Sequence, residues 1–149
     1  LELLNASEAE AFEGGLADAV KGANIFIGLS KPGLLTKDMV KSMDDKPIIF
    51  ALANPTPEIM PDEAMAAGAY IVATGRSDYP NQANNSLVFP GLFRGVLEAN
   101  IPQFKIEMFG AVAQTIADAV VDLGPQKILP GMFEDRIVTL VTETVKKLA

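Results

Sequence analysis

The side chains of this sequence that could carry chemistry lie in three polar segments, each directly after a short apolar run. These segments are Ser30 to Gly33, Asn54 to Pro57 and Gly75 to Asn85. Hydroxyl and carboxamide groups both donate and accept hydrogen bonds, which suits ribose hydroxyls, phosphates and carboxylates. The chemistry that these residue types predict is the binding and orientation of a polar ligand.

Two of the segments also have a plainer interpretation as turns. Ser30 could bind a ribose or a phosphate, with Lys31 adding a charge, or both could form a turn that leads to a helix cap at Thr36. Asn54 could bind a ligand, but asparagine before proline is also a common way to open a turn. From residue types alone, both interpretations remain open.

The third segment is long and rich in amides, as binding loops often are. Asn84 and Asn85 can hold a carboxylate through neutral donors, so no fixed charge is placed beside the reacting atoms. Arg76 and Asp78 are expected to pair and to hold the loop in shape. Tyr79 is expected to anchor it.

The apolar runs predict the elements that position these segments. The runs lack polar alternation, which is typical of strands covered on both faces, and they are residues 23–29, 47–53 and 70–73. Helical patterns lie between them, and strands that alternate with helices favour a parallel sheet. We therefore expect an α/β fold: a partial Rossmann-like parallel sheet of about three strands, with helices on both faces and a C-terminal helical tail.

The helical tail is predicted from apolar residues at three- and four-residue spacing. The expected helices cover residues 93–98, residues 102–123 and the segment from about residue 133. Their apolar stripes are predicted to be Phe109, Val112, Ile116, Val120 and Leu123 in the second helix and Ile137, Leu140, Val141, Val145 and Leu148 in the third. Near the start of the chain, Ser7 to Glu10 fits a capping box.

Composition excludes several classes of function. A net charge of −7 argues against binding to nucleic acid or to an anionic membrane, since both need a basic patch. The chain has no Cys and no His, so thiolate or histidine catalysis and Cys or His metal ligation are excluded for it. No apolar run reaches the roughly 20 residues of a membrane helix. We expect a cytoplasmic protein.

No G-x-G-x-x-G sequence follows a predicted strand, although the first half of a dinucleotide-binding fold normally supplies one. A three-stranded parallel sheet would also leave an apolar strand edge unpaired. We therefore expect the 149 residues to be part of a larger domain.

Longer motifs carry a resemblance to a known family. The segments GLSKPGLLT, ALANPTPEIMP and VATGRSDYPNQANNSLVFPGLFRGVLEA resemble malic enzymes of the bacterial type, almost without interruption. The resemblance extends from about Leu16 to the C-terminus. It identifies residues 1–149 as the C-terminal portion of the NAD(P)-binding domain, without the glycine-rich first half and the N-terminal catalytic domain.

The resemblance implies an oxidoreductase that converts L-malate to pyruvate and CO2 with NAD or NADP and Mg2+ or Mn2+. By motif position, Ser30 and Asn54 match cofactor-binding positions, and Asn54, Asn84 and Asn85 match substrate-binding positions. The family's acid–base tyrosine and lysine and its metal-binding carboxylates precede these motifs, so no catalytic or metal residue is assigned here. The acid–arginine pair Asp135-Arg136 is expected to be structural.

The resemblance also implies that the whole enzyme is a homo-oligomer. Within one enzyme chain, the partner of this segment is the remainder of the same enzyme. The isolated 149 residues are expected to be inactive. Two alternatives stay open at this point. One is another Rossmann-type dehydrogenase, and the other is a non-catalytic α/β module that binds a nucleotide or a protein.

Overall fold

Three short parallel strands form the sheet, each built mainly from β-branched and aromatic residues that favour extended backbone. They are β1 (Ile25–Gly28), β2 (Ile48–Ala51) and β3 (Ile71–Thr74), in the spatial order β1-β2-β3. Ile25 lies opposite Ile48, which lies opposite Ile71. The computed structural model describes residues 13–132 and 134–149, so the capping box predicted at residues 7–10 lies outside them. The predicted α/β class and the three parallel strands are confirmed.

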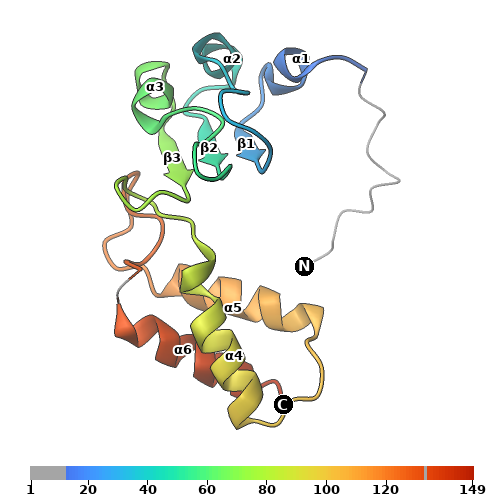
Figure 1. Cartoon of the computed structure of the whole chain (residues 1–149). Coiled ribbons are helices and arrows are strands. Elements are labelled where there is room, and N and C mark those ends of the chain that lie inside the picture. Colours follow the sequence, from blue (N-terminus) through green and yellow to red (C-terminus); the bar gives the residue numbers. More distant parts are fainter. Residues whose placement is uncertain (1–12, 133) are drawn as a thin grey trace.

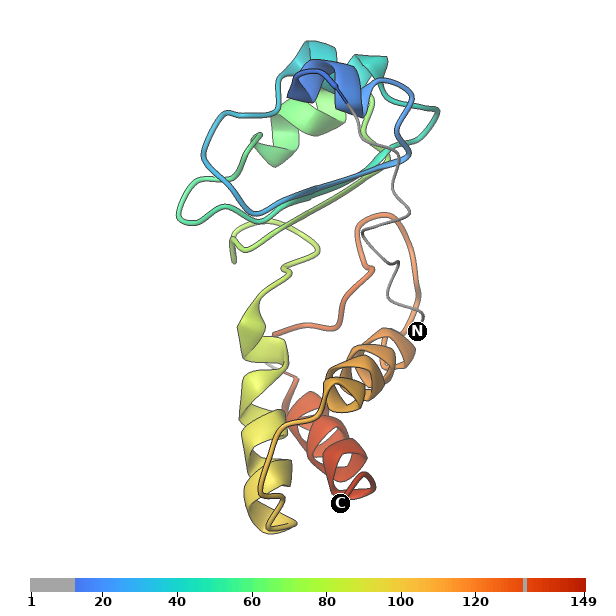
Figure 2. The same cartoon turned by 90° about the vertical axis from the view of Figure 1, so that its right-hand side faces the viewer.

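Helices α1 (Leu16–Val20), α2 (Lys37–Ser42) and α3 (Pro61–Ala66) lie on one face of the sheet (Figures 1 and 2). The sequence predicted helices on both faces of the sheet, but within the described residues these three helices share one face. Because the chain crosses from β1 to β2 to β3 in one direction, right-handed connections place α2 and α3 on the same side. The two faces of the sheet are therefore unlike.

The second face is partly exposed. Phe26 points toward the helices and is buried, whereas its neighbours Ile25 and Ile27 are 53% and 64% exposed. The expectation that the strands are covered on both faces is wrong for β1 within the described residues. Figure 2 shows this face turned toward the C-terminal helices.

The core of this α/β layer lies between the sheet and its three helices, and the cap predicted at Thr36 helps to orient α2. Thr36 Oγ1 accepts a hydrogen bond from the Met39 backbone N–H at 3.3 Å. The buried core consists of Val20, Phe26, Leu35, Val40, Met43, Ile49, Ala51, Ile59, Ala64, Ala67, Ala69 and Val72.

A second core lies among the C-terminal helices, below the sheet in Figure 1. These elements are the 3-10 turn η1 (Asn85–Leu87) and the helices α4 (Phe89–Glu98), α5 (Ile106–Asp118) and α6 (Asp135–Lys146). We call them the helical lobe. Its buried residues are Leu87, Leu92, Met108, Val112, Ile116, Ala119, Ile137, Val141 and Val145.

Helix α4 begins four residues earlier than the predicted start at Phe93. Pro90 lies in its first turn, where proline is tolerated. Gly91 and Gly95 lower local helix propensity, but they allow close contact with α6: a Cβ at either glycine would lie 2.6 Å from a valine Cβ of that helix. Tertiary packing therefore decided this boundary.

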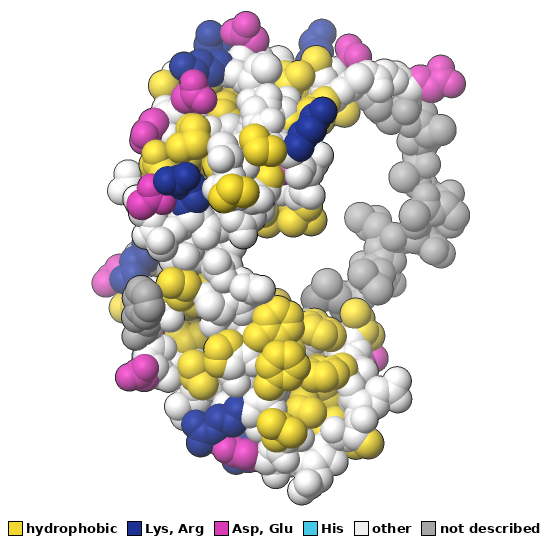
Figure 3. All heavy atoms as spheres, in the orientation of Figure 1, with side chains coloured by type: hydrophobic (Ala, Val, Ile, Leu, Met, Phe, Trp, Pro, Cys, Tyr) yellow, Lys and Arg dark blue, Asp and Glu magenta, His cyan; other side chains and the backbone are white. Residues whose placement is uncertain are grey.

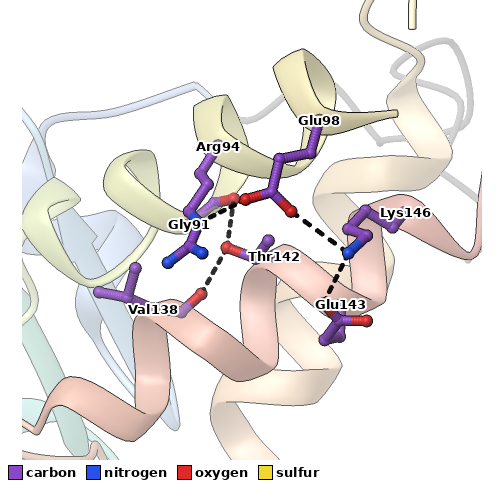
Figure 4. A network of polar contacts seen from close by, with 7 residues as sticks. All are labelled: Gly91, Arg94, Glu98, Val138, Thr142, Glu143 and Lys146. Carbon is purple, nitrogen blue, oxygen red and sulfur yellow. Dashed lines mark hydrogen bonds and ion pairs between the residues drawn. The ribbon is translucent and has the colours of Figure 1, made fainter. Parts of the chain in front are cut away.

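Polar contacts join α4 to α6 along the same seam (Figure 4). Thr142 Oγ1 donates to the carbonyl oxygens of Val138 and Gly91, at 2.7 and 3.2 Å. The Glu98 carboxylate accepts from Arg94 at 2.7 Å and pairs with Lys146 at 3.2 Å. These two cations hold the pKa of Glu98 below its ordinary value, with the Arg94 hydrogen bond as the larger cause.

Helix α5 is shorter than predicted, because residues 102–105 stay outside it and it ends at Asp118. Val112 and Ile116 of the predicted stripe are buried, whereas Phe109 is exposed and Met108 takes the inward place. In α6, Ile137, Val141 and Val145 are buried as predicted, but Leu140 is exposed.

Apolar side chains also gather on the surface of the helical lobe (Figure 3). The exposed rings form a row in which Phe89 stacks on Phe93, Phe93 meets Phe104 edge-on, and Phe104 stacks on Phe109, with centroid distances of 5.4 to 6.4 Å. None of the helices in the described ranges has both the length and the apolar character of a membrane span.

Candidate functional site

A cleft of about 500 Å³ lies at the carboxyl ends of β2 and β3. This is the edge of a parallel sheet where ligands bind in open α/β folds. Its walls are Ala53, Asn54 and Pro55 from the loop after β2; Gly75, Arg76, Ser77, Asp78, Gln82, Asn84 and Ser86 from the loop after β3; and Met132 from the segment before α6. The structure therefore brings two of the three predicted polar segments together.

Asn54 stands where the chain leaves the sheet, and its side chain is exposed at the cleft. The hydrogen bonds found among the described residues do not include its carboxamide. Both its donor and its acceptor can therefore face a ligand.

Asn84 lines the same cleft from the loop after β3, but its carboxamide already has local partners. The side-chain Nδ2 donates to the Gly75 carbonyl at 3.4 Å, and Oδ1 accepts from the Ser86 N–H at 3.0 Å. The second bond caps η1. Asn84 therefore shapes the loop, and its second donor hydrogen remains to serve a ligand.

Asn85 is exposed and lies beside a different hollow, of about 370 Å³, that is largely apolar. Asn84 borders both spaces, so the two are adjacent. Side chains from β2, η1 and α5 line the second hollow, among them Phe50, Leu87 and Ile116. An amide at an apolar wall can orient a small carboxylate more specifically than one in open solvent.

Ser30 does not line the cleft in the structure. It follows β1 and is exposed, and its backbone N–H donates to Glu58 Oε1 at 2.8 Å. Of the predicted site residues, Asn54, Asn84 and Asn85 are thus gathered at adjoining spaces, while Ser30 lies on the neighbouring loop.

The loop after β3 is held in shape as predicted. Arg76 donates twice to the Asp78 carboxylate, at 2.8 and 2.6 Å, and this pairing holds the pKa of Asp78 below its ordinary value. The Tyr79 hydroxyl donates to Asp62 at 3.1 Å, which ties the loop to α3 and raises the pKa of Tyr79. Tyr79 is therefore an anchor, as expected.

Sequence reasoning missed Asn81, whose side chain is buried inside the same loop. Its Nδ2 donates to the carbonyl oxygens of Val72 and Pro125, at 3.1 and 2.8 Å, and its Oδ1 accepts from the Ile128 N–H at 2.8 Å. One side chain thus joins β3, its loop and the segment after α5. Two of these partners, Pro125 and Ile128, are 44 and 47 residues away in sequence, so no local signal marked Asn81 out.

Two further residues were missed. Ser86 lines the cleft, and its Oγ is buried with no hydrogen-bond partner in the described part of the chain. Glu58 is fully buried behind the loops after β1 and β2. The position of Glu58 at the end of the NPTPE motif was a signal that could have found it.

The expected acid–arginine pair near the start of α6 is formed by another acid. Arg136 contacts Glu134, with its Nε at 2.8 Å, and also donates to the Ala119 carbonyl at 2.7 Å. Adjacent residues on a helix point in different directions, which separates Asp135 from Arg136. Arg136 therefore forms a structural ion pair, but its partner is Glu134 and not Asp135.

The described residues hold no cluster of three or more acidic side chains that could bind a metal ion. Asp62 and Glu63, which are neighbours in sequence, are used separately: Asp62 accepts from Tyr79, and Glu63 pairs with Lys37 at 3.4 Å.

Known proteins resemble this chain over nearly its whole length. Residues 5–149 match the family described as the malic enzyme NAD binding domain. A bifunctional malic/malolactic enzyme from Bacillus subtilis is 48% identical over 139 residues, covering 92% of this chain and 34% of that protein. An NADP-dependent malic enzyme from Rhizobium meliloti is 43% identical over 151 residues, covering 90% of this chain and 20% of that protein.

A solved structure agrees with the sequence matches. The malic enzyme from Pyrococcus horikoshii superimposes with a TM-score of 0.87 at 40% identity, over 92% of this chain and 32% of that one. The chain thus spans about a third or less of the length of the relatives that it matches. The motifs, the fold and these matches agree, and the chain belongs to the malic enzyme family as a part of its NAD-binding domain.

Proposed function

We propose that this chain forms one wall of the active site of an enzyme that converts L-malate to pyruvate and CO2 with NAD or NADP. The observation that carries the proposal is the convergence of Asn54 and Asn84 on one cleft at the carboxyl ends of β2 and β3. Family membership supports the reaction class, because the relatives are named malic enzymes.

The cleft has features that fit a nicotinamide cofactor and a small carboxylate. Ser86 Oγ is buried there without a partner in the described residues, and a ligand hydroxyl or carboxylate oxygen would satisfy it. A side chain at Gly75 would enter open space, with its nearest heavy atom 3.9 Å away, so a ligand can approach the backbone. Asn54 adds a donor and an acceptor from the loop after β2.

In this proposal the residues of the chain bind and orient, and they do not transfer protons. Asn54 holds the ligand where substrate and cofactor meet, while Asn85 donates to a malate carboxylate from the apolar hollow beside the cleft. The nicotinamide, when bound, would accept the hydride that leaves C2 of malate. Correct orientation lowers the barrier because the reacting atoms are already aligned.

The described residues do not fit a Mg2+ or Mn2+ site, because they lack a cluster of carboxylate ligands. No step assigned to this chain passes through a metal. For the whole protein we propose, from the resemblance, a dependence on Mg2+ or Mn2+ and a homo-oligomeric state. A cytoplasmic location is part of the same proposal but does not come from the resemblance.

The test is an assay of the intact protein with L-malate, MnCl2 and either NAD or NADP. We expect reduced cofactor, followed at 340 nm as absorbance, to appear in equal amount with pyruvate. The 149 residues alone should give no turnover, because the expected acid–base groups are not among them. An inactive intact protein would refute the reaction, and turnover by the 149 residues alone would refute the assigned role.

A further inference from the structure

We propose that Glu58 is a positioning residue: its buried carboxylate holds the loops after β1 and β2 at a set distance and so places Ser30 and Asn54 around one ligand. This inference rests on the proposed function, because it assumes that both loops contact the bound cofactor or substrate. The geometry that supports it involves both carboxylate oxygens of Glu58.

Each oxygen of Glu58 binds a different loop. Oε1 accepts from the Ser30 backbone N–H at 2.8 Å, and Oε2 accepts from the Ala53 backbone N–H at 3.1 Å. Ser30 lies just beyond β1, and Ala53 directly precedes Asn54. One side chain therefore spans the carboxyl ends of two neighbouring strands.

The surrounding backbone completes the clamp. Leu35 N–H donates to the Glu58 carbonyl at 3.1 Å, and Leu52 N–H donates to the Gly28 carbonyl at 3.0 Å. Gly28 leaves the room that the carboxylate occupies, because a Cβ there would lie 2.5 Å from Glu58 Cδ. The glycine at the end of β1 and the acid after β2 thus form one fitted unit.

Burial keeps the Glu58 carboxylate away from any ligand and leaves it the role of positioning the two loops. The residue is 0% exposed, so its carboxylate cannot touch a ligand in the cleft. The ion pairs of the described residues do not include it, so backbone N–H groups are the donors that offset the cost of burying it. If either hydrogen bond were lost, the buried carboxylate would be left partly unsatisfied. The arrangement therefore depends on the distance between the N–H groups of Ser30 and Ala53.

Glu58→Gln is the sharpest test, because glutamine has the same shape but can accept at one oxygen only. Its NH2 group would face one of the two N–H donors and push that loop away. A displacement near 1 Å can cost about 100-fold in rate, so we expect kcat/KM for malate to fall on the order of 10- to 100-fold. Glu63→Gln, at an exposed glutamate of α3, is the matched control and should retain wild-type kinetics.

The experiment measures kcat, KM for malate and the calorimetric Kd for NAD and NADP of the intact protein, below the unfolding temperature of each variant. A lower Tm with unchanged kcat, KM and Kd would overturn the proposal, because Glu58 would then serve stability alone. Glu58→Asp keeps the charge but shortens the reach, and it replaces the glutamine variant if that one does not fold.

Two further readouts keep the outcomes separate. In the unmodified protein, the amides of Ser30 and Ala53 should exchange slowly with deuterium, and fast exchange of either would also overturn the proposal. If wild-type protein binds a dinucleotide but does not turn over malate, the reaction assignment fails. The Kd values still test Glu58, with weaker binding by the glutamine variant supporting the positioning role and equal binding refuting it.

Discussion

At the scale of single residues, the candidate site uses neutral amides instead of fixed charges. In the proposed function, Asn54 and Asn85 offer amide donors to the ligand, whereas the charged side chains of Arg76 and Asp78 are paired with each other. A neutral donor holds an anionic substrate without fixing a large charge beside carbon atoms whose charge changes during reaction. Ligand binding is therefore assigned to the amide side chains, and the ion pair of Arg76 and Asp78 is assigned to the shape of the loop.

Replacing Asn85 tests the substrate assignment. Asn85→Ala removes a hydrogen bond to a charged carboxylate, which is worth about 1.5–3 kcal/mol, and should reduce kcat/KM roughly 10- to 100-fold. We expect a higher KM for malate and a lower kcat in steady-state assays of the intact protein. Gln103→Ala removes an exposed amide elsewhere and serves as the control. Wild-type kinetics in Asn85→Ala would remove Asn85 from the site.

At the scale of elements, the contact of α4 with α6 shows why glycine occurs inside a helix. A Cβ at Gly91 would lie 2.6 Å from Val141 Cβ and 2.8 Å from the Val138 carbonyl oxygen. The carbonyl belongs to a helix backbone and cannot move aside cheaply. The close approach therefore depends on the missing side chain.

Gly91→Ala should destabilise the protein although alanine is the better helix former. The gain in helix propensity is at most about 1 kcal/mol, whereas overpacking typically costs about 1–3 kcal/mol. We expect a net loss of up to about 2 kcal/mol in the free energy of unfolding, measured by chemical denaturation. Gly124→Ala, where an added Cβ meets no atom within 4 Å, is the control. Equal stability of the two variants would contradict the packing argument.

At the scale of the whole molecule, two separate cores meet beside the candidate site. One core lies between the sheet and its three helices, and the other lies inside the helical lobe. The loop after β3 leads from the first to the second. Asn81 binds β3 and the segment after α5 at once. Its three hydrogen bonds therefore help to hold the loop of the cleft between two independently packed units.

Asn81→Ala should weaken this connection. The substitution leaves buried backbone groups unpaired, each at a cost of about 1–3 kcal/mol, and it places alanine at a φ of 56°, where asparagine is better tolerated. We expect a lower midpoint of denaturation and faster hydrogen exchange at Ile128 in the intact protein. Asn24→Ala, which removes one exposed bond to Asp44, is the control. An effect no larger than the control would refute this role.

Sequence patterns predicted the elements well where the local signal and the packing agree. The three strands, the cap at Thr36 and the pair of Arg76 and Asp78 are confirmed. The start of α4 was wrong because local propensity disfavours Gly91 and Pro90, whereas contact with α6 favours the helix. Helices on both faces were wrong because strand order, which local sequence does not encode, decides the side of each crossover.

The family, the three polar segments and the amides that could bind a ligand were all predictable, because they depend on residue types and on their spacing along the chain. The fold brings some of them together: Asn54 and Asn84 line the same cleft, and Asn85 lines the adjoining hollow. Glu58 joins the backbone of Ser30 to that of Ala53, the residue before Asn54. The reason is physical. A buried carboxylate or amide acts through partners that the fold brings together from distant positions, and the pattern of neighbouring residues carries no record of those distances.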